Sequence, residues 1–83
     1  MNLITVSISI IDRQIYDYNM LLKQHIQDFV RDFILVEISD LELLRFIICY
    51  KKLPEGIVLC QFHLSRLSGK ITPEMQLLLI EMM

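Results

Sequence analysis

The chain has few of the residues that most catalytic and ligand-binding motifs require. Only two of its 83 residues are glycine, Gly56 and Gly69, which are too few for a phosphate-cradling loop. Its two cysteines, Cys49 and Cys60, stand eleven residues apart, a spacing that fits neither a redox CxxC pair nor a zinc knuckle. We therefore expect two ordinary buried thiols, with no disulfide, no metal and no cofactor.

Long hydrophobic runs are also missing. No apolar stretch reaches the 18 residues that suggest a membrane span. The first residues carry no basic segment, and Asp12 and Arg13 follow the first apolar stretch, so the sequence does not resemble a signal peptide. These absences favour a location in the cytoplasm.

The chain has no excess of basic residues. Its formal net charge is −2 and its pI is about 5.5, which argues against a nucleic-acid partner. The charge is divided unevenly, because residues 1–42 hold seven acids and three bases, whereas residues 43–83 hold three acids and five bases. The bases of the second half predict a weak basic face for an acidic protein surface; they are Arg45, Lys51, Lys52, Arg66 and Lys70.

Apolar residues, by contrast, are abundant. They make up 54% of the chain and give a mean hydropathy of +0.50. A domain this small has room for one core, and it buries about 60% of the surface that its unfolded chain exposes. The excess either enriches that core and leaves scattered leucines outside, or forms a contiguous exposed patch. We favour the patch, which predicts a binding surface for another protein.

Two segments near the start alternate with the period of β-strands. Isoleucine or valine occupies every second position from Ile4 to Ile10, with threonine and serine between them. Residues 14–20 alternate again, with Tyr16, Tyr18 and Met20 on one side. The pattern predicts an N-terminal β-hairpin.

A helical period follows. Apolar residues at 26, 29, 30, 33 and 34 form one stripe, which predicts a helix lying across the hairpin. Ser39 and Glu42 fit a capping box that would begin a single helical turn. The alternative is one longer helix through Ile48. We prefer the short turn, because residues 46–50 are dense in strand-forming residues and a bend at 54–56 follows.

The last third predicts two more strands, a short one at residues 57–59 and a final one at 75–81, joined by an irregular connection over 64–72. The element order is therefore β-β-α-β-β-β, an α+β fold in one domain spanning residues 1–83. Its predicted core comprises Ile4, Val6, Ile8, Phe29, Val30, Phe33, Leu53, Leu59 and Leu77. Truncating Phe33 should then destabilise the fold as a large core truncation does.

Two segments carry a family resemblance. Residues 51–59, with Leu53, Gly56 and Leu59 in phase, resemble the segment of ubiquitin that leads into its later strands. Residues 15–18, Ile-Tyr-Asp-Tyr, followed by a short linker and an isoleucine-rich helix, resemble the EsaB/YukD family of small ubiquitin-like proteins from Gram-positive type VII secretion loci.

This resemblance implies a ubiquitin-like β-grasp, in which a mixed sheet packs on one main helix. It also implies a cytoplasmic accessory or regulatory component of the secretion machine, held near the inner face of the membrane through a protein partner. The chain ends in two methionines without Gly-Gly, so we expect noncovalent binding and no conjugation chemistry. The alternative is a stand-alone β-grasp adaptor, structural or regulatory, of another system.

In ubiquitin the partner face is the outer side of the sheet, and the matching segments here are residues 45–52 and 75–83. The partner-binding residues that this implies are Arg45, Ile47, Lys51, Lys52, Leu78, Ile80 and Met82. Flexible methionines beside charged residues suit a partner surface. Without its partner, such a surface should associate with a second copy as a twofold dimer. The competing interpretation is that these side chains cover a second small cluster under the 64–72 connection.

Catalytic motifs are not found. The paired acids Asp28 and Asp32 fall on the polar side of the predicted helix, where a solvated face explains them. His25 and His63 are 38 residues apart and lack partners at metal-ligand spacing. Cys60 with His63 has no third group to complete a nucleophile. We expect no enzymatic activity.

Overall fold

The fold is helical throughout the part of the chain that a computed structural model describes, residues 3–71 and 73–81, with side chains at 7–71, 73, 76, 77, 79 and 80. Its four helices are α1 (Leu3–Leu22), α2 (Asp28–Tyr50), α3 (Gln61–Ser68) and α4 (Pro73–Glu81). The predicted α+β fold, a ubiquitin-like β-grasp with a mixed sheet, is therefore wrong, since none of these described residues forms a strand.

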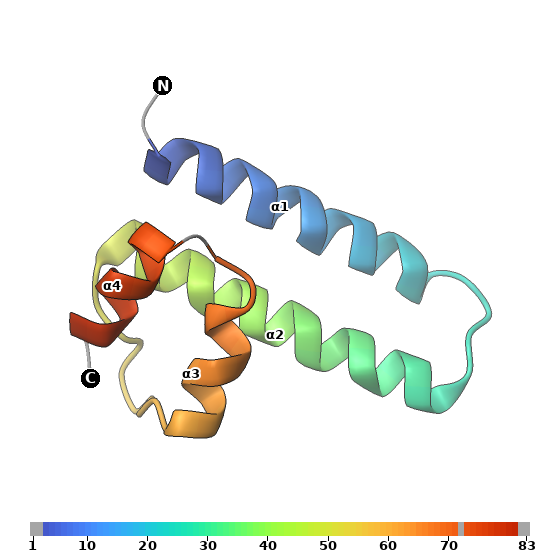
Figure 1. Cartoon of the computed structure of the whole chain (residues 1–83). Helices are drawn as coiled ribbons and strands as arrows, with labels where there is room; N and C mark the ends of the chain where they lie inside the picture. The colour runs from blue at the N-terminus through green and yellow to red at the C-terminus, as the bar shows by residue number, and fades with distance from the viewer. Residues whose placement is uncertain (1–2, 72, 82–83) are drawn as a thin grey trace.

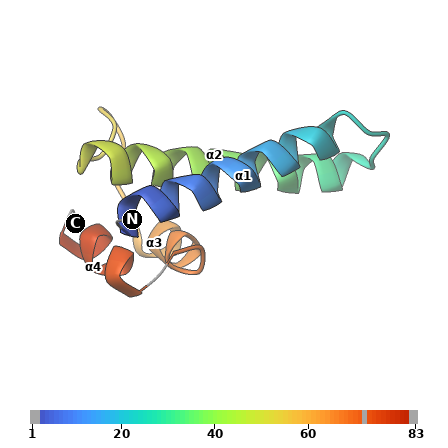
Figure 2. The ribbon, with the colours of Figure 1, turned by 90° about the horizontal axis from the view of Figure 1, so that it is seen from above.

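The first two helices form an antiparallel hairpin, and the two short helices lie at one end of it (Figure 1). Seen from above, α3 and α4 both lie on the same side of the hairpin (Figure 2). The connection between α1 and α2 marks the opposite end, which the short helices do not reach. The hairpin thus has one covered end and one end that projects into solvent.

The first helix replaces the predicted β-hairpin because a second pattern runs through the same residues. Ile8, Ile11, Ile15 and Tyr18 are spaced by three and four residues, and all four pack at the core. The alternation between Ile4 and Ile10 therefore overlaps a helical stripe that continues well beyond it. A strand would bring only half of these side chains to one face, whereas the helix brings the whole series together.

The second helix follows the longer alternative weighed from the sequence. It begins after Gln27, whose carbonyl accepts a hydrogen bond from the Arg31 amide at 3.0 Å. It ends at Lys51, which adopts a left-handed conformation with φ of 55° and donates its amide to the Ile47 carbonyl at 2.7 Å. Ser39 and Glu42 lie inside this helix and start no new one.

The remaining predicted strands also correspond to other structures. Gly56, with φ of +83°, sits in the turn after Pro54, where the Ile57 amide bonds the Pro54 carbonyl at 3.1 Å. The connection expected over 64–72 instead contains most of α3. The expected final strand at 75–81 is α4, which Pro73 begins at the helix position that best tolerates proline.

The core is built from isoleucine and leucine of all four helices and the connection before α3. Its buried members are Ile11, Leu41, Leu44, Ile47, Ile48, Leu59, Leu67 and Leu79. Of the predicted core, Leu59 is buried, Ile8 and Leu53 pack against the cluster, and Val30 is half-buried. Phe29, Phe33 and Leu77 are exposed, so their assignment to the core is wrong. Ile4 and Val6 lie outside the described side chains.

Candidate interaction surface

A buried carboxylate fastens α3 to α2. Asp40 is 2% exposed, and its two oxygens accept hydrogen bonds from the Arg66 guanidinium, Oδ2 from Nε at 3.0 Å and Oδ1 from Nη2 at 2.8 Å. This two-bond geometry is the strongest arrangement available to the pair. The Arg66 guanidinium also lies 5.2 Å from the centre of the Phe62 ring.

Two further side chains, Lys70 and His63, complete the polar cluster. The Lys70 ammonium lies 3.1 Å from Glu37 Oε2 and 4.0 Å from Asp40 Oδ2, and His63 Nε2 lies 3.7 Å from Asp40 Oδ1. Because Asp40 is already engaged by Arg66, its carboxylate is committed to holding the two helices together. The contacts of this cluster are those of a structural element that holds α2 and α3 together.

The Cys60 and His63 side chains serve different purposes. The Cys60 sulfur caps the first turn of α3 by accepting the His63 backbone amide at 3.4 Å, while the His63 imidazole lies beside Asp40. Both thiols, Cys49 and Cys60, are free and exposed, so the prediction that they are buried is wrong. Among the side chains that the structure describes, no group of three His, Cys, Asp or Glu residues is placed to hold a metal ion.

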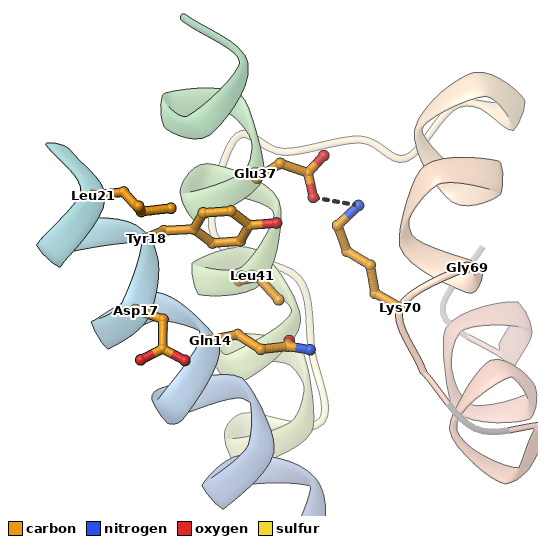
Figure 3. Close-up of a pocket in the computed structure, with 8 residues that line it drawn as sticks. All are labelled: Gln14, Asp17, Tyr18, Leu21, Glu37, Leu41, Gly69 and Lys70. Atoms are coloured by element: carbon orange, nitrogen blue, oxygen red, sulfur yellow. Dashed lines mark ion pairs between the residues drawn. The ribbon is translucent and has the colours of Figure 1, made fainter. Parts of the chain in front are cut away.

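An open pocket of about 450 Å³ lies between the hairpin and the start of the α3–α4 connection (Figure 3). The Lys70–Glu37 ion pair spans it, and the phenol of Tyr18 points toward that pair (Figure 3). Its lining residues are Gln14, Asp17, Tyr18, Leu21, Glu37, Leu41, Gly69 and Lys70. Asp17 is paired with Arg13 at 3.2 Å. With these charges already paired, the pocket resembles the edge of the α3–α4 cover more than a prepared ligand site.

The residues predicted for partner binding are not brought together as one sheet face. Arg45 reaches across to α1, where its Nε lies 2.6 Å from Asp12 Oδ1, and this carboxylate raises the pKa of the guanidinium above its usual value. Ile47 is fully buried and has no surface for a partner. Lys51 and Lys52 are exposed at the C-terminal end of α2.

Of the three remaining predicted residues, only Ile80 on α4 has a described side chain. Ile80 is exposed there, 56% accessible to solvent. The side chain of Leu78, and Met82 entirely, lie outside the described residues. Lys51, Lys52 and Ile80 are therefore exposed, but the reason for grouping them, a shared β-sheet face, does not exist in the described fold.

Sequence reasoning missed a second, largely apolar row on α2, which borders the buried stripe at Leu43 and is otherwise turned away from it. We call it the outer seam, and it consists of Phe29, Asp32, Val36, Ser39, Leu43, Phe46 and Tyr50. These positions are separated alternately by three and four residues, the spacing of the contact positions in a coiled coil. At 3.6 residues per turn they fall within an arc of about 100°.

The outer seam faces solvent along much of its length. Phe29, Val36 and Tyr50 are 71%, 46% and 63% exposed, and Asp32 and Ser39 are exposed as well. Leu43 is half-buried because it also packs against the core cluster, and Phe46 is half-buried with its ring 4.6 Å from the Tyr50 ring between centres. From Val36 to Tyr50 no seam position carries a charge. The three-and-four spacing is visible in the sequence, but dividing this segment into a helix, a turn and a strand concealed it.

Comparisons with family models, curated proteins and solved structures find no significant match. The helical fold contradicts the expected likeness to the EsaB/YukD family, and the type VII secretion role that depended on it is not carried forward. In the described ranges no helix combines the length and hydrophobicity needed to cross a membrane.

Proposed function

We propose that the protein is a noncovalent protein-interaction module without enzymatic activity, and that the outer seam is its binding surface. The observation that carries the proposal is the charge-free row from Val36 to Tyr50, in which Val36, Ser39 and Tyr50 are exposed and the two residues between them are half-buried. A surface helix normally buries one apolar stripe and presents polar residues elsewhere. This helix has a buried stripe and a second, largely apolar one.

The distribution of aromatic residues supports the same proposal. The chain has four phenylalanines and, of these, Phe29, Phe33 and Phe62 are 71%, 59% and 71% exposed. The buried cluster meanwhile consists of isoleucine and leucine. Large aromatic side chains contribute strongly to protein interfaces, where each buries a large rigid area at a small cost in conformational entropy. Their position outside the core therefore favours a protein-binding role, and Phe29 is the one of the three that belongs to the outer seam.

A protein partner fits this surface better than the other classes. The sequence pI of about 5.5 does not favour nucleic acid. The Asp40 cluster already uses its charged groups to join α2 and α3, which favours a structural role for them over a catalytic one. We also propose a cytoplasmic location, which agrees with two free, exposed thiols in a small domain.

The proposal is tested by two valine substitutions of the same chemistry. Val36→Asp places a carboxylate in the outer seam, whereas Val58→Asp places one at an 85% exposed position on the connection before α3. We expect crosslinking in the producing cells to show complexes with the wild type and Val58→Asp but not with Val36→Asp. Helical circular dichroism should be the same for all three. Complexes that survive in Val36→Asp would reject the outer seam as the binding surface.

A further inference from the structure

We propose that the outer seam binds a second copy of this chain, with the two α2 helices antiparallel about a twofold axis. This inference rests on the proposed function and names the partner of the same surface. Charge is distributed asymmetrically along α2. Acidic residues stand at the N-terminal end of the seam and basic residues at its C-terminal end, with apolar residues between them.

The two ends are chemically complementary. Asp28 and Asp32 are exposed at the start of α2, and none of the described cations forms an ion pair with either. Lys51 and Lys52 are exposed just past its end. An antiparallel arrangement places the acidic end of each helix beside the basic end of the other, twice per dimer. A parallel arrangement would bring like charges together, which is unfavourable.

The backbone adds to the same preference. Each helix carries partial positive charge at its N-terminus and partial negative charge at its C-terminus. Two antiparallel helices place opposite ends together, so the contribution of the dipoles has the same sign as that of the side chains. A twofold dimer also needs a surface that is complementary to itself, and a helix with opposite charges at its two ends satisfies this requirement.

Seam spacing restricts how the two helices can align. In an antiparallel pair, seam positions spaced alternately by three and four residues can face those of the second copy in two alignments, or registers, that keep the middle of the seam paired. In one register Asp32 faces Leu43 of the second copy, which would bury a carboxylate against an apolar side chain. In the other register Asp32 faces Tyr50 of the second copy, whose hydroxyl can donate a hydrogen bond to it and which adjoins Lys51.

The second register also matches side-chain sizes. It places Ser39 opposite Leu43 of the second copy and Val36 opposite Phe46 of the second copy. Pairing a small side chain with a large one at each layer allows close packing. We therefore assign this register. Its twofold axis passes at the level of Leu41 along the helix, on the face opposite the one where the Leu41 side chain is buried.

Sedimentation velocity of the purified chain tests the assignment directly. We expect a monomer–dimer equilibrium over a concentration series. Ser39→Arg places a long charged side chain in the central layers and should raise the dimer dissociation constant by at least roughly tenfold. The matched control is Ser9→Arg, at an exposed position on α1, which should leave it unchanged. Circular dichroism should show equal helix content for both variants.

Charge reversal tests the antiparallel direction. One variant carries Asp28→Lys and Asp32→Lys, and a second carries Lys51→Glu and Lys52→Glu. Each alone should weaken the dimer, because it places like charges together at both ends of the interface. An equimolar mixture should form a heterodimer, and a chain with all four changes should recover the wild-type dissociation constant. A parallel dimer would not be weakened by either variant alone.

The possible outcomes separate this inference from the proposed function. A wild-type chain that stays monomeric at the highest concentration rejects the second copy as the partner. If Val36→Asp still abolishes complexes in cells, the proposed function stands with a different protein on the seam. A dimer insensitive to Ser39→Arg would show that the copies meet elsewhere. Recovery in the charge-reversed mixture, together with the Ser39→Arg effect, confirms the antiparallel seam.

Discussion

The two halves of α2 differ in what covers them. The C-terminal half lies among α1, α3 and α4, and it holds Leu44, Ile47 and Ile48 in the buried cluster. The N-terminal half lies in the part of the hairpin that the short helices do not reach (Figure 1). There, Phe29 and Phe33 remain exposed although they are larger and as apolar as the buried residues. Ile34 and Ile38 are buried in this half as well, so the face of the helix and the position along it, more than side-chain hydrophobicity, decide which residues support the fold.

The largest effect that this comparison predicts is a difference between two truncations. Leu44→Ala should lower the free energy of unfolding by about 3 kcal/mol, because it leaves a cavity at a fully buried position. Phe33→Ala, at the uncovered half, should change it by less than about 0.5 kcal/mol. Urea unfolding of both variants provides the measurement. Equal losses would show that Phe33 is covered in solution, as the sequence-based core assignment required.

A smaller loss in the free energy of unfolding should follow when the Asp40–Arg66 pair between α2 and α3 is removed. Asp40→Ala removes two charge-assisted hydrogen bonds from Arg66 and should cost about 2 kcal/mol. Arg66 is partly exposed and can turn toward water, which keeps the loss below that of stranding a fully buried charge. Glu42→Ala, an exposed acid on the same helix, is the control and should be nearly neutral. An undiminished unfolding midpoint in Asp40→Ala would mean that α3 is held by apolar packing alone.

The smallest effect concerns the end of the covered half. Lys51 has φ of 55°, a conformation that glycine adopts without the steric cost paid by other residues. Lys51→Gly should therefore stabilise the fold, by up to about 1 kcal/mol, visible as a higher thermal midpoint. Lys52→Gly provides the comparison, since Lys52 lacks positive φ and gains nothing from the change. If both substitutions destabilise equally, the left-handed turn does not persist in solution.

Sequence reasoning predicted parts of this fold for identifiable physical reasons. It found a helical stripe at residues 26–34, and Ile34 and Val30 do face inward to different degrees. It failed on orientation because Phe29 and Phe33 are equally apolar and fit the same period. No rule of periodicity says which of two stripes on one helix will be covered by a distant part of the chain.

The strand assignments failed for a related reason. Isoleucine and valine favour strands on average, but tertiary packing overrides this preference when the residues also fall on a helical face. Ile8, Ile11 and Ile15 do so, and they extend the pattern past the alternating segment. Lys51 and Lys52, predicted as partner-binding, are exposed just past the end of α2, whereas the row from Val36 to Tyr50 can be seen only once residues 28–50 are recognised as one continuous helix.

The projecting end of the hairpin also sets how the molecule should open. Regions with fewer buried contacts unfold locally at lower free energy than the global transition, and backbone amide hydrogen exchange measures this site by site. Amides near the α1–α2 connection should exchange first, and those around Leu44 and Ile47 should exchange only when the whole fold opens. Each chain would then unfold locally from this one end, and a molecule bound to the first turns of α2 would slow hydrogen exchange of the amides there.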